Sequence, residues 1–138
     1  MRRASSQCFR PADRLHHRRE FESVYRCGQR AGARELTVFL APGQEPFHRL
    51  GLAVPRRLGS AVRRNRIKRR VREAFRCSRE RIPGCYDMVV HPGKAAATLA
   101  FADLCEVLIQ TAMRAVRVRP ASGNRRPCTN RRSRRKGE

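Results

Sequence analysis

Apolar residues recur at helical spacing in three segments of the chain, and each segment is predicted to form a helix that buries one side. The first segment follows Pro11 and ends at Gly28, a residue type that commonly terminates helices. The second covers residues 60–81, with Ser60 placed to cap its first turn. The third covers residues 101–118, and its inner face is expected to consist of Leu104, Val107, Leu108, Thr111, Ala112 and Ala115.

Shorter apolar runs lie between these helices and are typical of strands. They cover residues 35–41, 49–54 and 86–91, and the last is expected to be central in a sheet. Pro55 ends the second run, because proline cannot donate to a strand ladder. The order is therefore α-β-β-α-β-α, with room for a further strand before the second helix. It predicts an α+β fold, a small sandwich of helices packed on one sheet.

The chain has 138 residues, a length that favours one domain. We expect residues 12–118 to form it. Residues 1–11 are interpreted as a disordered basic arm. Residues 119–138 are predicted to be a disordered Arg-rich tail, because they contain too few apolar side chains to build a core.

Charge narrows the range of partners. The chain carries 33 Lys and Arg against 11 Asp and Glu, a formal net charge of +22. Such a balance favours polyanions, with nucleic acid first. Arginine, which dominates the basic residues, binds phosphate in a bidentate manner and stacks on bases, which favours RNA. No apolar run is long enough to span a membrane and no secretory signal is recognisable, so we expect a cytoplasmic protein without a membrane partner.

The predicted helix over residues 60–81 carries a dense cationic face. Its basic residues fall within about four turns: Arg63, Arg64, Arg66, Lys68, Arg69, Arg70, Arg72 and Arg76. Like charges four residues apart repel by about 0.2–0.5 kcal/mol per pair, and ordinary surface helices mix charges of both signs. A polyanion bound to this face would offset the repulsion, while Ile67, Val71 and Phe75 can hold the opposite side to the sheet.

No motif places catalytic side chains together in the protein itself. Acid and base groups for a nuclease, an alternative that stays open, would have to come from His16, His17, His48, His91 and Lys94. The six cysteines show no CxxC spacing, and a metal site would require a set such as Cys77, Cys85 and His91. No cluster of Asp and Glu offers a Mg²⁺ site. We therefore expect neither a catalytic residue nor a metal site in this chain.

Three stretches of the sequence together resemble the protein component of bacterial ribonuclease P. They are RLHHRREFESVYRCG, LGLAVPRRLGSAVRRNRIKRRVREAFR and GCYDMVVHP. Within the second stretch, Arg64-Asn65-Arg66 followed by Ile67-Lys68-Arg69 is similar to the RNR signature of that family. The resemblance extends over residues 15–118, nearly all of the expected domain.

The resemblance implies a function and a set of partners. The chain would be the protein subunit of a tRNA 5′-maturation endoribonuclease, with the catalytic RNA and precursor tRNA as partners and no obligate protein partner. The RNA subunit would hydrolyse the phosphodiester bond with Mg²⁺ held mainly by the RNA, and the protein alone would bind no cofactor. The resemblance also implies a left-handed β-α-β crossover, an exception to the usual right-handed rule.

Residue roles also follow from the resemblance. Contacts to the catalytic RNA are expected from Arg64, Asn65, Arg66, Lys68, Arg69 and Arg72. A cleft that binds the single-stranded 5′ leader is expected to use Phe21, Tyr25, Phe39, Arg56 and Arg57. Bases stacked on aromatic rings gain about 1–3 kcal/mol each with little sequence preference. For Phe39, a purely apolar core role is an equal alternative.

Two binding alternatives remain at the level of the sequence. A general structural RNA-binding protein, for example one associated with the ribosome, would explain the charge but less well the aromatic positions and the RNR signature. A sequence-specific DNA-binding protein would need a more varied reading helix than one filled with arginine.

Overall fold

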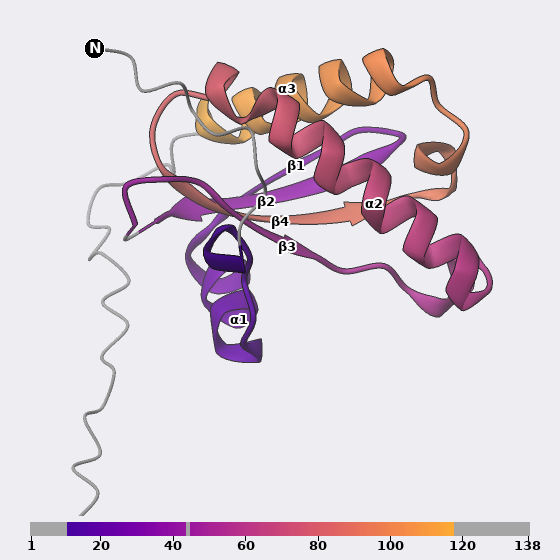
Figure 1. Ribbon diagram of the computed structural model, residues 1–138. Coiled ribbons are helices and arrows are strands. Elements are labelled where there is room, and N and C mark those ends of the chain that lie inside the picture. The colour runs from indigo at the N-terminus through magenta and orange to yellow at the C-terminus, as the bar shows by residue number, and fades with distance from the viewer. Residues whose placement is uncertain (1–10, 44, 118–138) are drawn as a thin grey trace, which may run out of the picture.

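The computed structural model describes residues 11–43 and 45–117. A four-stranded sheet lies at its centre, in the order β1-β2-β4-β3 (Figure 1). The strands are β1 (Gln29–Gly32), β2 (Leu36–Pro42), β3 (Arg49–Leu52) and β4 (Tyr86–Pro92). β2 pairs antiparallel with β1 and β4, whereas β3 pairs parallel with β4. The predicted α+β class is confirmed, β4 is central as expected, and β1 is the further strand.

Helices cover both faces of the sheet. α1 (Arg18–Cys27) lies on one face, and α2 (Ala61–Ser78) lies with α3 (Phe101–Arg117) on the other (Figure 1). Short 3₁₀ turns connect these elements: η1 (Pro11–Asp13), η2 (Arg56–Leu58), η3 (Arg79–Arg81) and η4 (Lys94–Ala97). The disordered arm and tail that the sequence predicts fall outside the described residues, except that Pro11 already begins η1.

The first helix begins at Arg18, later than the apolar pattern predicts. Residues 11–15 form η1 and a bridge that pairs Arg14 with Leu50 of β3. His16 and His17 therefore precede the helix instead of lying on it. Both backbone N–H groups donate to one carboxylate oxygen of Glu20, at 2.8 and 3.2 Å, and this side chain fixes where the helix starts.

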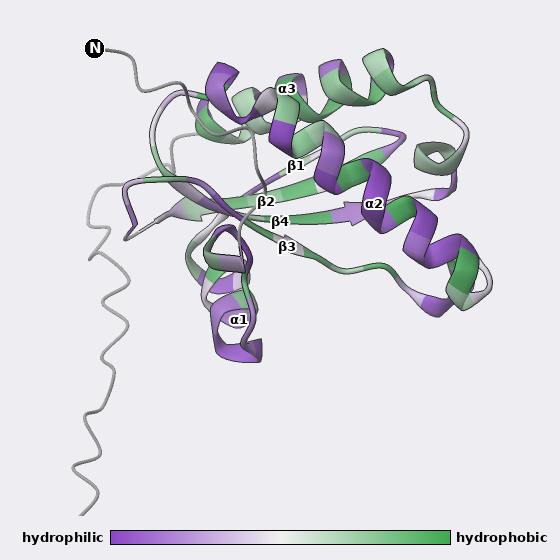
Figure 2. Cartoon of the chain, viewed as in Figure 1, coloured by the Kyte–Doolittle hydropathy of each residue, from purple (hydrophilic) through white to green (hydrophobic). Residues whose placement is uncertain are grey.

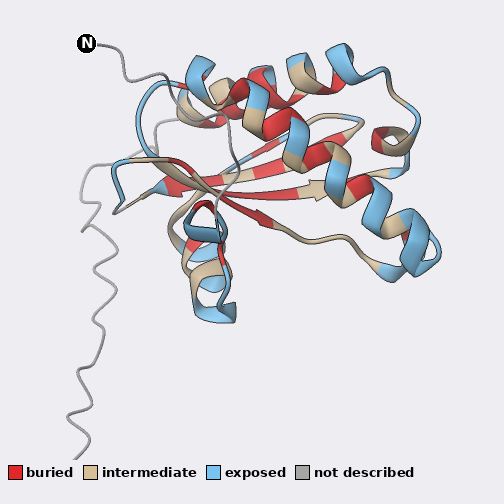
Figure 3. Ribbon diagram, viewed as in Figure 1, coloured by how far each residue is buried: buried red, intermediate tan, exposed pale blue. Residues whose placement is uncertain are grey.

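Two apolar clusters lie on opposite faces of the sheet, as strand alternation requires. The larger lies between the sheet and the α2–α3 layer and includes Val38 and Leu40 of β2. Figure 3 shows buried residues along the strands and on α2 and α3. The smaller lies beneath α1 and consists of Leu15, Val24, Ala41 and Val89, with Phe21 and Phe39 packed against it.

Arg49 ties α1 to the sheet. Its guanidinium group donates twice to Asp87 of β4, at 2.9 and 2.8 Å, and once to Glu20 of α1 at 3.1 Å. Hydrogen bonds to ionised groups in such bidentate geometry are stronger than neutral ones. The network holds α1 at a fixed position across the sheet, which in turn fixes the aromatic residues of α1.

The crossover from β3 to β4 runs through α2, which returns the chain to a parallel neighbouring strand. The connection turns at η2 and Gly59, whose φ of 130° favours glycine. Ser60 then caps α2, because its hydroxyl oxygen accepts the Arg63 N–H at 3.3 Å, as the sequence predicts. The left hand of this crossover stays a prediction.

Candidate RNA-binding surfaces

One candidate surface lies on the α1 face of the sheet, where α1 leaves the strands partly uncovered. The register places Thr37 of β2 opposite His91 of β4, and Arg30 of β1 opposite Phe39 of β2. Because side chains alternate along a strand, these residues share the face that α1 approaches. Tyr25 reaches the same place from the helix.

Three rings from three elements meet there. Tyr25 and Phe39 pack edge to face with centroids 4.9 Å apart, and His91 lies 5.5 Å from Tyr25 and 5.2 Å from Phe39. The Tyr25 hydroxyl and His91 Nε2 are hydrogen-bonded at 2.7 Å. Tyr25 stays 39% exposed and Phe39 is half-buried. We call Tyr25, Phe39 and His91 the aromatic cluster. Phe39 and His91 are partly buried in it, whereas the Tyr25 ring remains accessible to solvent.

Phe21 occupies a different position. Its ring lies over Gly51 of β3, where a Cβ would come within 2.7 Å of Cε1. It also packs against the cluster that contains Leu15. Phe21 and Tyr25 lie four residues apart on α1. Phe21 supports the contact of the helix with β3, whereas Tyr25 joins the aromatic cluster.

A cleft of about 350 Å³ opens beside the aromatic cluster. Phe39 and His91 contribute to its wall, together with Thr37 and the backbone around Pro92. Its basic side chains are Arg30, Arg34 and Arg57. Of the two predicted arginines of η2, Arg57 lines the cleft, and Arg56 is exposed in the same turn.

Sequence reasoning missed several residues of this cleft. Arg30 and Arg34 lie in a segment without an apolar pattern, and Thr37 and His91 alternate with core residues in their strands. The available signal was strand parity: a polar residue flanked by apolar ones in a strand faces away from the main core. The sequence alone indicates His91 only as a candidate catalytic or metal-binding group.

A second candidate surface is the outer side of α2, and Figure 2 shows its hydrophilic residues alternating with apolar ones. Ile67, Val71 and Phe75 are fully buried, as predicted. The residues expected to bind the catalytic RNA lie on the remaining sides, half-buried or exposed, and their side chains make no hydrogen bond or ion pair with the described part of the chain: Arg64, Asn65, Arg66, Lys68, Arg69 and Arg72. Arg64 Nε is buried without a hydrogen-bond partner there.

The side chains of two other arginines of α2 bind acceptors within the protein. Arg70 donates to the carbonyl oxygen of Ala97, at 2.5 Å, and to that of Leu99, and so binds the chain that leads into α3. Arg76 pairs with Glu73 one turn earlier. The structure thus separates the basic residues of the helix into a group with acceptors in the protein and a group that faces solvent.

Arg14 extends the cationic surface beyond α2. Asp13 pairs with Arg79 at 3.2 Å, which docks η1 against the end of α2. Burial, together with the positive charges of Arg14 and Arg69, lowers the pKa of Arg72. Guanidinium groups from two distant segments therefore gather at one place, a feature that no local sequence pattern could show.

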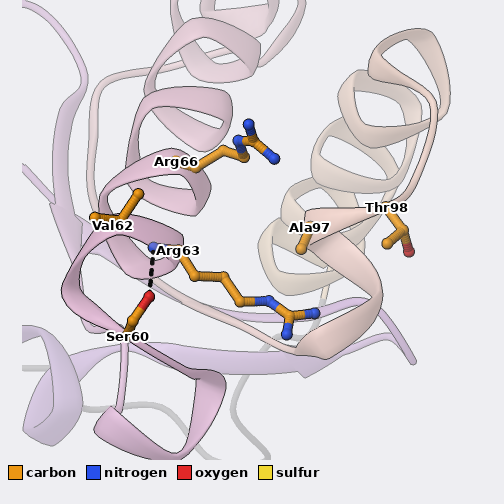
Figure 4. A pocket seen from close by; sticks show the side chains of 6 residues that line it. All are labelled: Ser60, Val62, Arg63, Arg66, Ala97 and Thr98. Carbon is orange, nitrogen blue, oxygen red and sulfur yellow. Dashed lines mark hydrogen bonds between the residues drawn. The ribbon is translucent and has the colours of Figure 1, made fainter.

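A shallow pocket lies at the first turn of α2 (Figure 4). Arg63 and Arg66 point from the helix toward η4, where Ala97 and Thr98 form the opposite wall. The pocket continues the cationic surface toward η2 and the cleft. The two candidate surfaces, on opposite faces of the sheet, therefore approach each other around residues 55–60.

The histidines do not assemble into an acid–base pair in the described residues. His48 is buried: its Nε2 donates to the Ile82 carbonyl oxygen at 2.9 Å, and its Nδ1 accepts from the Tyr86 N–H at 3.0 Å. His16 Nε2 contacts the Pro11 carbonyl oxygen at 2.7 Å. His91 is held by Tyr25.

The set of metal ligands suggested by the sequence lies within residues 11–43 and 45–117. This part of the chain has no group of three or more His, Cys, Asp or Glu side chains placed to hold a metal ion, so Cys77, Cys85 and His91 do not form such a site. Within the same residues, no helix combines the length and the apolar character needed to cross a membrane.

A basic helix and an aromatic cleft on one small sheet define an α+β protein built to bind nucleic acid. Residues 9–116 match the family model described as Ribonuclease P, and the chain belongs to this family. The ribonuclease P protein component of Syntrophobacter fumaroxidans is 42% identical over 108 residues, covering 78% of this chain and 90% of that protein.

Solved structures agree with this assignment. The ribonuclease P protein of Thermotoga maritima is 33% identical, with a TM-score of 0.66, covering 73% of this chain and 96% of that one. The Staphylococcus aureus ribonuclease P protein is 27% identical, with a TM-score of 0.65, covering 74% and 94%. The family match over residues 9–116 contains both candidate surfaces.

Proposed function

We propose that this chain is the protein subunit of a ribonuclease P and promotes removal of the 5′ leader from precursor tRNA. Its α2 surface binds the RNA subunit through phosphates and riboses, and its cleft binds the leader. The RNA subunit, with Mg²⁺ held mainly by RNA, performs the hydrolysis. Phosphate contacts position a protein without reading bases, as a processing enzyme with many substrates requires.

One observation carries this proposal: residues 55–60 connect two chemically different surfaces, with Pro55 and Arg57 in the cleft and Ser60 at the first turn of α2. The α2 surface presents guanidinium groups without acceptors in the described part of the chain, as a structured RNA backbone requires. The cleft presents rings and arginines, which suit a single strand. Arg57 of η2 lies in the cleft and leads directly into α2, so one protein can contact both RNAs at their junction.

A general RNA-binding role is the competing function. It would explain the net charge of +22, but it gives no reason for an aromatic cleft beside a separate cationic helix. Membership in the ribonuclease P family also does not favour it.

The test is cleavage of precursor tRNA by a bacterial ribonuclease P RNA at low Mg²⁺, with and without the protein. We expect the protein to restore cleavage at the mature 5′ end. The double variant Arg64→Ala/Arg66→Ala should abolish this effect. The matched control, Arg81→Ala/Arg117→Ala, removes two exposed charges outside both surfaces and should retain it.

Two results would contradict the proposal. Cleavage that stays unchanged when the protein is added, while the protein still binds RNA, would favour the general RNA-binding role. Equal losses in both double variants would show that total charge, and not the α2 surface, is responsible.

A further inference from the structure

His91 lies where the aromatic cluster meets the cleft. Its imidazole is hydrogen-bonded to the Tyr25 hydroxyl at 2.7 Å and lies 5.2 Å from the ring of Phe39. Thr37 of β2 is its cross-strand partner. His91 also lines the cleft. A ring that both supports Tyr25 and lines the cleft is placed to respond to whatever fills the cleft.

The charged side chains that line the cleft beside His91 are all positive among the described residues. Arg30 from β1, Arg34 from the turn before β2 and Arg57 from η2 line the same cleft, and no carboxylate is among its described lining residues. From α1, the facing titratable group is the Tyr25 phenol, whose pKa is raised by burial, so that it stays neutral near pH 7. Burial and then the charge of Arg30 hold the pKa of His91 below its ordinary value of 6.5. In the free protein, the neutral imidazole is therefore the dominant form at pH 7.

The hydrogen bond to Tyr25 can persist in both charge states of His91. When the imidazole is neutral, the phenol O–H can donate to Nε2. When it is charged, Nε2–H donates to the phenol oxygen, and the phenol O–H is released to donate elsewhere. The heavy atoms need not move, so the aromatic cluster can accept a proton without rearranging.

A polyanion in the cleft changes this balance. A leader phosphate among Arg30, Arg34 and Arg57 would neutralise the charges that oppose protonation of His91. An opposite charge within about 4–6 Å favours the charged form of a titratable group. The released Tyr25 hydroxyl and the new imidazolium would both be donors facing an acceptor-rich ligand.

We propose that His91 is a further leader-contacting residue and that leader binding in this cleft takes up a proton on its imidazole. The inference rests on the proposed function, since it assigns the cleft to the leader. By linkage, a group that gains a proton on binding makes the complex tighter as pH falls, by at most about tenfold per pH unit for one proton.

The primary experiment measures how much the leader adds to affinity. Reconstituted holoenzyme is titrated with precursor tRNA and with the same tRNA without its leader, between pH 5.5 and 8, with Ca²⁺ replacing Mg²⁺ to slow cleavage. The ratio of the two dissociation constants cancels pH effects on RNA folding and on the α2 surface. We expect the ratio to favour the leader increasingly as pH falls in the wild type, but not in His91→Gln, whose amide stays neutral.

A second measurement, on the wild-type protein, keeps the inference testable if His91→Gln is unstable. In the full-length protein, the imidazole proton signals of His91, assigned by their absence in His91→Gln, are followed by NMR against pH with and without a short single-stranded RNA. The protonation midpoint should rise with RNA. A midpoint that does not move, or a leader contribution equally independent of pH in both proteins, overturns the inference while leaving the proposed function intact. A leader that adds no affinity at any pH overturns the assignment of the cleft itself.

Discussion

Gly51 has no side chain, and this leaves the space on the α1 face that the Phe21 ring occupies. A methyl group at this position would meet the Phe21 ring at 2.7 Å and Leu15 at 3.1 Å. Gly51→Ala should therefore displace Phe21 and lower the free energy of unfolding by about 1–3 kcal/mol, the usual range for overpacking. Urea denaturation followed by circular dichroism measures the change.

Gly32→Ala is the matched control for this substitution. Gly32 is also in a strand, but the nearest atom to an added Cβ is Thr37 Oγ1 at 3.8 Å, an ordinary contact distance. It should unfold at nearly the same urea concentration as the wild type. If both variants lost the same stability, backbone flexibility and not the Phe21 contact would be the cause.

Adjacent arginines of α2 should behave in opposite ways. Arg70→Ala removes donors from the Ala97 and Leu99 carbonyls and should destabilise the fold by about 1–3 kcal/mol. Arg69→Ala loses no such contact and should leave the unfolding transition in place. It should instead weaken binding of the RNA subunit and reduce the slope of log affinity against log salt by about one unit.

Urea denaturation and filter binding at several salt concentrations separate the two effects. A large loss of stability in Arg69→Ala would mean that the side chain has a structural partner. An unchanged salt slope would remove it from the RNA contact.

Among the elements, those that depend on local sequence were predictable. α2 and α3 begin and end within a few residues of their predicted bounds, because an apolar stripe and the Ser60 cap are both local signals. The sequence does not specify β1, because Gln29–Gly32 has a single buried residue, Ala31, and is a strand only through its pairing with β2. The apolar pattern predicts too early a start for α1. The helix begins only at Arg18, because the Glu20 carboxylate accepts hydrogen bonds from the N–H groups of His16 and His17.

In the candidate site, too, residues that follow one another along one element could be predicted, whereas residues brought together by the fold could not. The cationic surface of α2 could be predicted, because its residues follow one another along a helix. His91 could not be assigned to the cleft, because its neighbours Thr37 and Tyr25 come from other elements through sheet register and the crossing of α1. Arg14 joins Arg69 and Arg72 only through the docking of η1.

The docking of α1 should depend on pH through Glu20. Burial alone would raise the pKa of this carboxyl, but the N–H groups of His17 and His16 and the charge of Arg49 outweigh it, and the pKa lies below the ordinary 4.5. A carboxyl with a lowered pKa in the folded state stabilises the fold above its unfolded pKa. That stabilisation is lost as pH falls through the folded value.

Glu20→Gln should therefore be less stable than the wild type at pH 7, by about 1–2 kcal/mol, the order of a lost helix cap or charged hydrogen bond. The difference should shrink below pH 4, where the wild type loses the same interactions. Urea titrations at pH 7 and pH 3.5 give both values. Glu22→Gln, which removes an exposed charge on the same helix, is the control and should differ little at either pH. A difference for Glu20→Gln that is undiminished at pH 3.5 would place the effect in packing instead of charge.

The whole molecule concentrates positive charge as it folds. Its 33 Lys and Arg are opposed by only 11 Asp and Glu, which leaves a net charge of +22, and folding brings Arg14, Arg69 and Arg72 close to one another. Self-repulsion of this kind destabilises a compact state. An anion that binds the folded form but not the unfolded chain should raise the free energy of unfolding. Above its dissociation constant, this gain grows with the logarithm of the anion concentration.

Sulfate is expected to raise the melting temperature for this reason. At ten times its dissociation constant, one bound ion adds about 1.4 kcal/mol, which corresponds to roughly 5–10 °C for a domain of this size. Sodium chloride at equal ionic strength is the control, because it screens charge without offering the oxygen acceptors that arginine binds in pairs. Thermal melts in both salts should separate by several degrees at tens of millimolar sulfate, and the gap should narrow in Arg69→Ala/Arg72→Ala. Coincident melts would show that screening alone stabilises the protein and that folding does not preform an anion site at Arg14, Arg69 and Arg72.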